Sequence, residues 1–177
     1  DVHIGSQIDE IAPMRAAFER VIDLIKRLRD KGHAISRVDL GGGLGIPYKS
    51  SDSPPPPSDY ANMIREVTEG LGLDVILEPG RVIAGNAGVL VTEALFVKPA
   101  PQRNFLIIDA GMNDLMRPAL YQAHHDFMPL RERPEDAEQV RYDIVGPICE
   151  STDKFAAERL MPRIEGGDRL AIMSAGA

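Results

Sequence analysis

The segment Ser36–Gly45 has the sequence SRVDLGGGLG. Its first five residues predict a short strand, and the glycines that follow Leu40 predict a tight loop at the end of that strand. A glycine loop in this place has two possible uses. It is either a simple turn, or it brings backbone N–H groups close to a phosphate, because no side chain stands in the way.

Similar units are predicted on both sides of this segment. Residues 13–31 carry apolar residues at steps of three and four, with Pro13 in the first turn, and so predict a helix. A second helix is predicted with Ser58 as its cap and Tyr60 in its apolar stripe, and residues 74–77 predict the next strand. Residues 2–4 also suggest a strand. Strands that alternate with helices and end in polar or glycine-rich loops are typical of parallel α/β proteins, whose functional groups lie on those loops.

The pattern changes near residue 86. Beyond it, strands are predicted at residues 89–97, 105–109, 140–145 and 169–173, with a short helical turn near residues 115–121 and no long helix. The chain is therefore predicted to be an α/β protein in two parts. Residues 1–86 form an α/β domain and residues 87–177 form a β-rich domain.

Composition and charge exclude several classes of protein. The net charge of −7 argues against nucleic-acid binding, which usually requires a basic face. No apolar run reaches the roughly 18 residues that suggest a membrane span. Cys149 is the only cysteine, so no internal disulfide can form and a reducing, cytoplasmic setting is expected. No metal site is predicted, because the adjacent His124 and His125 would point to opposite faces of a strand. Both chain ends are interpreted as truncations.

Polar residues follow the predicted strands of the first domain. A histidine such as His3 can stack on a flat ligand, and the hydroxyl of Ser6 can bind phosphate, although a single histidine is more often only packed or solvated. Arg81 can pair with a phosphate or a carboxylate, and Glu78 with a protonated ring nitrogen. The alternative for this second pair is an ordinary turn with a surface ion pair.

Two further groups lie in the β-rich half. Arg117 and Tyr121 are four residues apart, so a helical turn places them on one face, where both can bind a carboxylate. A capped surface turn is the alternative. Cys149 and Glu150 follow a bend, and a thiol there is either a proton donor or nucleophile or, more commonly, a small buried apolar residue.

Six motifs in this order resemble the fold-type III pyridoxal-phosphate-dependent decarboxylases, and within them the members that act on diaminopimelate. They are HIGSQ at 3–7, DLGGGLG at 39–45, EPGR at 78–81, DAGM at 109–112, RPALY at 117–121 and CESTD at 149–153. The resemblance covers essentially the whole chain. It implies the second half of an alanine-racemase-like (β/α)₈ barrel over residues 1–86, followed by part of a β-rich C-terminal domain over residues 87–177.

The resemblance also implies that pyridoxal 5′-phosphate is the cofactor. His3 resembles the residue that stacks on the pyridine ring, and Glu78 resembles the partner of the pyridine nitrogen, whose protonated form it favours. The phosphate cradle corresponds to Ser6, Gly42, Gly43, Gly80 and Arg81.

The remaining motif residues resemble the family's substrate site. Arg81, Arg117 and Tyr121 match positions that hold the substrate's carboxylates, and Glu150 matches the acid that recognises the distal amino group. Cys149 resembles the proton donor, which in this family reaches the active site of the neighbouring subunit and so implies a homodimer.

The implied reaction is decarboxylation of meso-2,6-diaminopimelate to L-lysine and CO₂. Arginine suits carboxylates and glutamate suits an ammonium group, so this set of charges fits a diamino diacid. Two alternatives stay open. One is a related decarboxylase that acts on ornithine, arginine or carboxynorspermidine, and the other is a module that binds pyridoxal phosphate without catalysis. None of the five lysines matches the family's lysine that holds the cofactor covalently, so the 177 residues alone are expected to be inactive.

Overall fold

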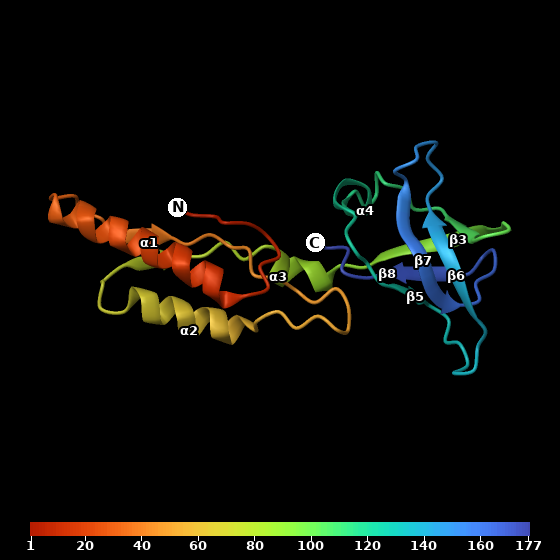
Figure 1. Ribbon diagram of the computed structural model, residues 1–177, viewed down its shortest axis with the longest axis horizontal. Helices are drawn as coiled ribbons and strands as arrows, with labels where there is room; N and C mark the ends of the chain where they lie inside the picture. Colours follow the sequence, from red (N-terminus) through yellow and green to blue (C-terminus); the bar gives the residue numbers. More distant parts are fainter. The chain divides into compact units, whose positions relative to one another are not determined.

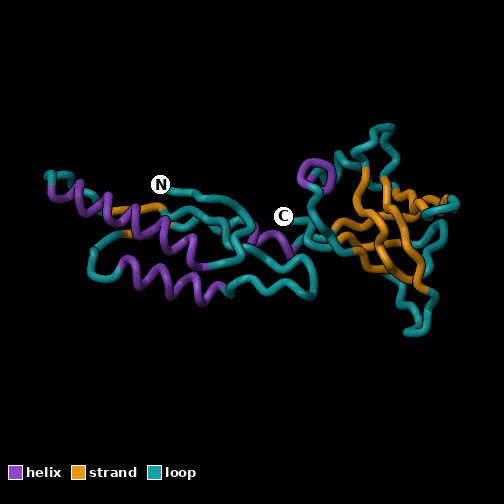
Figure 2. Tube along the Cα trace, viewed as in Figure 1, coloured by secondary structure: helices purple, strands orange, loops and turns teal.

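A computed structural model of the protein describes all 177 residues, which divide after Asn86 into two units. Unit 1 comprises Asp1–Asn86 and unit 2 comprises Ala87–Ala177. Figure 2 shows that helices and loops make up most of unit 1, whereas strands dominate unit 2. The chain is an α/β protein, as the sequence predicts.

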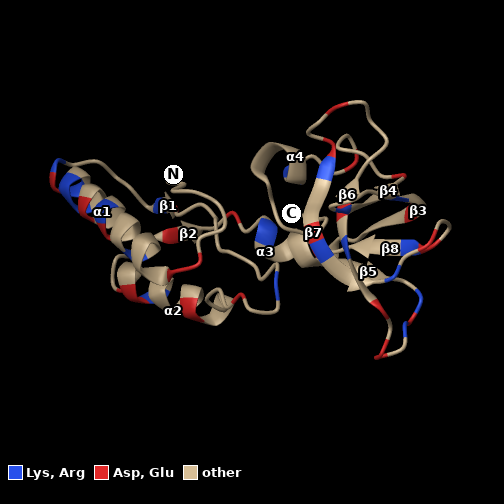
Figure 3. Cartoon of the chain, turned by 45° about the vertical axis from the view of Figure 1, so that its right-hand side comes forward, with Lys and Arg blue, Asp and Glu red and all other residues tan.

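Two helices of unit 1 lie side by side, α1 (Ile11–Asp30) and α2 (Pro57–Thr68) (Figure 1). Their apolar stripes meet in one core with residues of strand β1 (Arg37–Asp39), and the rings of Phe18 and Tyr60 are in edge contact at 6.3 Å. Figure 3 shows acidic and basic residues next to one another along α1. None of the helices has the length and apolar composition that crossing a membrane requires.

The predicted start of each helix was wrong in detail. Helix α1 begins at Ile11, two residues before Pro13, which nevertheless lies in its first turn. Helix α2 is capped by Pro56 and begins at Pro57, so Ser58 is inside the helix and not its cap. A proline suits the first helical position because its φ is already fixed near the helical value and its missing N–H has no partner there to lose.

Three parallel segments lie next to one another in unit 1. Strands β1 and β2 (Asp74–Ile76) pair in parallel, with Val38 opposite Val75. The N-terminal segment lies along β1 without forming a regular strand, contrary to the prediction for residues 2–4. The N–H of Val2 donates to the carbonyl of Asp39 at 3.1 Å, and Ile8 forms a parallel bridge with Leu44. Because the three segments run in the same direction, the loops that follow them meet at one edge.

A mixed six-stranded sheet forms most of unit 2, with the strand order β5-β8-β3-β4-β6-β7 (Figures 1 and 2). The four strands predicted for residues 87–177 are confirmed as β3 (Leu90–Pro99), β4 (Asn104–Ile108), β6 (Gln139–Val145) and β8 (Arg169–Ile172). The predicted helical turn is α4 (Arg117–Tyr121). The sequence interpretation missed β5 (Phe127–Pro129), β7 (Lys154–Pro162) and the short helices α3 (Arg81–Ala84) and η1 (Gly85–Ala87).

Candidate active site

The loops that follow the parallel segments of unit 1 are in direct contact. A Cβ atom added at Gly42 would lie 2.1 Å from the carbonyl oxygen of Glu78, and one at Gly43 would lie 2.3 Å from the carbonyl oxygen of Gly5. Gly43 also has a φ of +104°, which side chains rarely adopt. Only glycine therefore permits this approach of three backbones, which brings the loops of His3–Ser6, Gly42–Gly43 and Glu78–Arg81 together.

Backbone donors are available on the glycine loop. The N–H of Gly41 donates to the Asp39 carboxylate at 2.9 Å, whereas the N–H groups of Gly42, Gly43 and Gly80 donate to no group of the chain. Gly42 is buried and Gly43 is half-buried. Clustered N–H groups of this kind are suited to binding an anion such as a phosphate.

Gln7 joins the loops through its side chain, although the sequence analysis assigned it no role beyond its place in the first motif. Its Oε1 accepts hydrogen bonds from Arg81 Nη1 and from the N–H of Ile46, each at 3.2 Å, and its Nε2 donates to the carbonyl of Ile46 at 2.7 Å. An amide can donate and accept at once, so one residue fixes both the Arg81 guanidinium and the loop after the glycines.

The side chains of His3, Ser6 and Glu78 are exposed at this edge of unit 1. The carboxylates of Asp1, Asp39 and Glu78 lie within 4.8 Å of one another. Negative charge is therefore gathered at a place where the cationic part of a ligand is favourably held.

Tyr60 borders the glycine loop from the side of α2. With Gly41, Gly42 and Gly43 it lines a cavity of about 210 Å³, and its hydroxyl is buried without a hydrogen-bond partner. Burial, and then the negative charge of Asp39, raise the pKa of Tyr60. The sequence pattern identified Tyr60 only as a core residue, because a stripe of apolar and aromatic residues does not distinguish a packed hydroxyl from one at a cavity wall.

Arg117 and Tyr121 lie one turn apart on α4, as the sequence predicts. Tyr121 is 73% exposed, and Arg117 is half-buried with its Nη1 3.1 Å from Nε2 of His125. Helix α4 ends at Tyr121, and Gln122, which caps it, has a left-handed φ of 52°.

Cys149 and Glu150 project from the loop between β6 and β7, where both are exposed. Cys149 is thus not a buried apolar residue in this chain. Asp153 holds the base of the loop, because its carboxylate accepts hydrogen bonds from the N–H groups of Met112 and Ile148, each at 2.7 Å. A cavity of about 430 Å³ lies between α4 and the start of β7, so this loop and the helix of Arg117 belong to neighbouring parts of unit 2.

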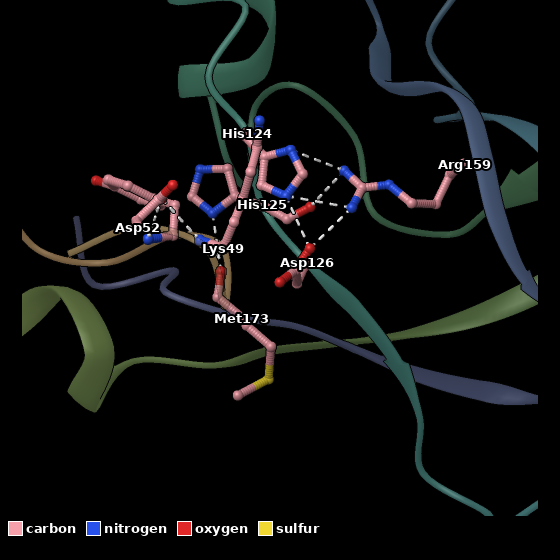
Figure 4. Close-up of polar contacts among 8 residues, drawn as sticks. Lys49, Asp52, His124, His125, Asp126, Arg159 and Met173 are labelled. Atoms are coloured by element: carbon pink, nitrogen blue, oxygen red, sulfur yellow. Dashed lines mark hydrogen bonds and ion pairs between the residues drawn. The ribbon is translucent and has the colours of Figure 1, made fainter.

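Figure 4 shows the two adjacent histidines with different partners. His124 lies 2.7 Å from Asp126 and also contacts Arg159, whereas Nδ1 of His125 lies 2.8 Å from the carbonyl oxygen of Met173. Both histidines precede β5, so the reason given for their separation, alternation along a strand, does not apply.

The sequence matches the family model of the pyridoxal-dependent decarboxylases, C-terminal sheet domain, over residues 9–176. The chain belongs to the pyridoxal-dependent decarboxylase family. Within this family it is 49% identical, over 177 residues, to a diaminopimelate decarboxylase of Pseudomonas aeruginosa, and the match covers 100% of this chain and 42% of that protein. A solved diaminopimelate decarboxylase of Helicobacter pylori, complexed with L-lysine, is 38% identical with a TM-score of 0.91 over 99% of this chain and 43% of that one.

A crystal structure of a protein from Aquifex aeolicus is also similar, with a TM-score of 0.94 at 46% identity over 99% of this chain and 43% of that chain. The chain spans 41–42% of the length of the curated diaminopimelate decarboxylases from Aquifex aeolicus and Pseudomonas aeruginosa that it matches.

Proposed function

We propose that this chain provides the noncovalent cofactor site and the substrate-recognition residues of a decarboxylase that converts meso-2,6-diaminopimelate to L-lysine and CO₂. The observation that carries the proposal is the close approach of the glycine loop to the loop of Glu78, at the edge where His3 and Ser6 also lie. The relatives at 42–49% identity are named diaminopimelate decarboxylases, which supports this choice of substrate. The activity is proposed for a protein of the relatives' length, and the 177 residues alone are expected to be inactive.

For unit 1 we propose the second half of an alanine-racemase-like (β/α)₈ barrel, and for unit 2 part of the β-rich C-terminal domain. The three parallel segments with α1 and α2 support the barrel, because they repeat the strand-helix unit from which such barrels are built. The matching family model is described as a C-terminal sheet domain, which supports the assignment of unit 2.

Pyridoxal phosphate fits the residues present in unit 1. When bound, it supplies an electron sink for the electron pair left at Cα as CO₂ departs. Ser6, the N–H groups of Gly42, Gly43 and Gly80, and Arg81 would hold the phosphate. The glycine N–H groups donate to no group of the chain, and the glycines have no side chain that would occupy the space of a phosphate, so this set of residues fits one.

The ring of the cofactor would be held by the two exposed residues at the same edge. Glu78 carries a negative charge that favours a protonated ring nitrogen, and Asp39 beside it reinforces that charge. His3 would stack on the ring and exclude water from one of its faces.

The substrate would be recognised by charged groups of both signs. Arg81, Arg117 and Tyr121 would bind its carboxylates, and Glu150 would bind its distal ammonium group. An exposed Glu150 on an anchored loop, and an exposed Tyr121 at a helix end, suit residues that contact a ligand rather than the core of unit 2.

Cys149 would deliver a proton to Cα after CO₂ leaves. We propose that it acts at the active site of a neighbouring subunit in a homodimer, and its exposure on an anchored loop supports this role. A reducing cytoplasm, in which an exposed thiol persists, is the setting that suits it.

Replacement of Cys149 separates an enzyme from a module that only binds pyridoxal phosphate. In a protein of the relatives' length, Cys149→Ala is expected to lower kcat by about 10²–10⁴-fold, the usual contribution of a general acid, with cofactor absorbance unchanged. Ser151→Ala, two positions further along the same loop, is the matched control. Unchanged turnover in Cys149→Ala would refute the assigned role, and a wild-type protein that binds the cofactor without turnover would identify a binding module.

A further inference from the structure

We infer that His125 is a positioning residue, whose neutral imidazole orients the guanidinium of Arg117 for binding a substrate carboxylate. This inference rests on the proposed function, because that function assigns a carboxylate to Arg117. It also gives a role to one of the two adjacent histidines, which the sequence did not connect with the site.

The ring of His125 is almost fully buried, with 1% of its surface exposed, and both of its nitrogens are engaged. Nδ1 lies 2.8 Å from the carbonyl oxygen of Met173, and Nε2 lies 3.1 Å from Nη1 of Arg117. A carbonyl only accepts hydrogen bonds and a guanidinium only donates them. The hydrogen must therefore be on Nδ1, and Nε2 must present its lone pair to Arg117. The geometry allows only the neutral Nδ1–H tautomer.

The support for this ring comes from fixed backbone. Met173 directly follows β8, and its N–H donates to the carbonyl of Asp126 at 2.8 Å. Nη2 of Arg159 donates to the carbonyl of His125 itself at 3.1 Å. The orientation of Arg117 is thus tied, through one imidazole, to the sheet of unit 2.

A neutral imidazole can orient an arginine without offsetting its positive charge, whereas a carboxylate does both. Arg159, on β7, lies 2.8 Å from the Asp126 carboxylate, which offsets its charge. The contact with His125 orients Arg117 without adding negative charge beside it. This contact orders the guanidinium, so less side-chain entropy is lost when a carboxylate binds.

Protonation of His125 would remove this support. Burial lowers the pKa of His125, and the positive charge of Arg117 on α4 and the proximity of His124 lower it further, while the Met173 carbonyl and Asp126 oppose the change. Arg159 on β7 also lies beside this segment. The ring is therefore neutral near pH 7. At acid pH, an N–H at Nε2 would face the N–H of Arg117, and the contact would be lost.

The first test reads the tautomer directly and does not depend on activity. In the protein of the relatives' length with cofactor bound, ¹⁵N NMR of His125 is expected to show a neutral ring protonated at Nδ1 at pH 7. The resonance is assigned by its absence from His125→Asn. A ring protonated at Nε2, or a charged ring, would overturn the inference even if diaminopimelate is turned over.

The second test uses variants that keep one side of the ring at a time. His125→Asn retains a donor near the Nδ1 position but no acceptor for Arg117, and is expected to raise KM for diaminopimelate about tenfold with little change in kcat. His125→Gln places an oxygen near the Nε2 position and is expected to restore most of this loss. His124→Asn is the matched control and should leave KM near the wild-type value.

A double-mutant cycle completes the test. In an Arg117→Ala background, His125→Asn is expected to cause no further rise in KM, because the residue acts only through Arg117. If His125→Asn raised KM by the same factor in the wild-type and in the Arg117→Ala background, its role would be merely structural, and this would contradict the inference. A wild-type protein that does not use diaminopimelate would refute the proposed function, and the tautomer measurement would then still decide the geometry of His125.

Discussion

The carboxylate of Asp153 lies 2.7 Å from the backbone nitrogen of Ile148, and this contact closes the base of the loop that carries Cys149 and Glu150. The other carboxylate oxygen accepts the N–H of Met112 at 2.7 Å, so two loops of unit 2 are joined by one buried acid. Asp153 is 3% exposed. The exposed thiol and carboxylate above it are therefore held by a rigid base.

Replacement of this acid should weaken the loop measurably. Asp153→Asn keeps one carbonyl acceptor but turns an N–H₂ group toward the second backbone donor, which leaves that donor buried and unpaired. We expect a loss of about 1–3 kcal/mol in the free energy of unfolding, measured by chemical denaturation. Asp136→Asn, at an exposed position, is the control. Equal stability of the two variants would show that the Asp153 carboxylate does not anchor the loop.

The glycine loop makes a steric prediction. A methyl group at Gly42 would lie 2.1 Å from the Glu78 carbonyl oxygen, so Gly42→Ala must push two parallel segments apart. We expect a loss of about 1–3 kcal/mol in unfolding free energy, the usual cost of overpacking, together with weaker binding of pyridoxal phosphate.

Gly80→Ala provides the matched comparison for stability, because a methyl group at Gly80 meets no atom within 4 Å and its φ is −94°. Its unfolding free energy should stay close to that of the wild type. Similar losses in the two variants would mean that the approach of the Gly42 and Glu78 backbones is not required for the fold.

The hydroxyl of Tyr60 is buried without a hydrogen-bond partner. Such a hydroxyl lowers the stability of the fold, and a phenylalanine at this position would not carry it. Tyr60→Phe keeps the ring against Phe18 and removes only the hydroxyl. We expect the free energy of unfolding to stay the same or to rise by about 1 kcal/mol, measured without cofactor. A clear loss of stability would contradict this, because it would require a hydrogen-bond partner for the hydroxyl.

The stability of unit 2 should depend on the ionisation of Asp143. Burial alone would raise the pKa of this carboxyl, but hydrogen bonds from the N–H of Glu158, from Arg103 and from Lys154 outweigh burial and lower the pKa below its ordinary value. The folded state therefore binds the proton less tightly than the unfolded state does. The resulting stability is complete above the unfolded pKa of about 3.9 and is lost as pH falls through the lower folded pKa.

Asp143→Asn is therefore expected to be less stable than the wild type at pH 7 by about 1–3 kcal/mol. The difference should narrow as pH falls below about 4, where the wild-type carboxyl is itself protonated. Denaturation curves of both proteins from pH 7 to pH 2 measure this, and the comparison cancels carboxylates such as Asp109 that titrate in both. A difference that is constant over the whole range would exclude ionisation of Asp143 as its cause.

Periodic patterns made most of the secondary structure predictable. The apolar stripe of α1 indicates a helix, and the alternation of Val140, Tyr142 and Ile144 with polar residues indicates strand β6. Strand β4 is recognisable as a short apolar run. Strand β7 was missed because its alternation is broken. Glu158 has a left-handed φ of 48°, and the pairing of β6 with β7 shifts register near Tyr142 and Ile144. A bulge of this kind depends on the partner strand, which the local sequence does not reveal.

The candidate site was predictable where it consists of motifs, and less so where it depends on contacts distant in sequence. His3, Glu78 and Arg117 stand in motifs, so the sequence could name them as candidates. The partner of Arg117 is His125, whose own partner Met173 lies 48 residues further along the chain. The hydrogen bond of Gln7 to Arg81 spans 74 residues. Such pairs are created by the fold, so residue types and spacing alone did not identify them.

The most direct test is the product that a protein of the relatives' length forms from meso-2,6-diaminopimelate, compared with L-ornithine in a parallel assay. We predict lysine and CO₂ in equal amounts from diaminopimelate, and turnover of ornithine lower by at least about a hundredfold, because ornithine lacks the distal carboxylate that the arginines are proposed to bind. Strong turnover of ornithine with none of diaminopimelate would contradict the proposed function.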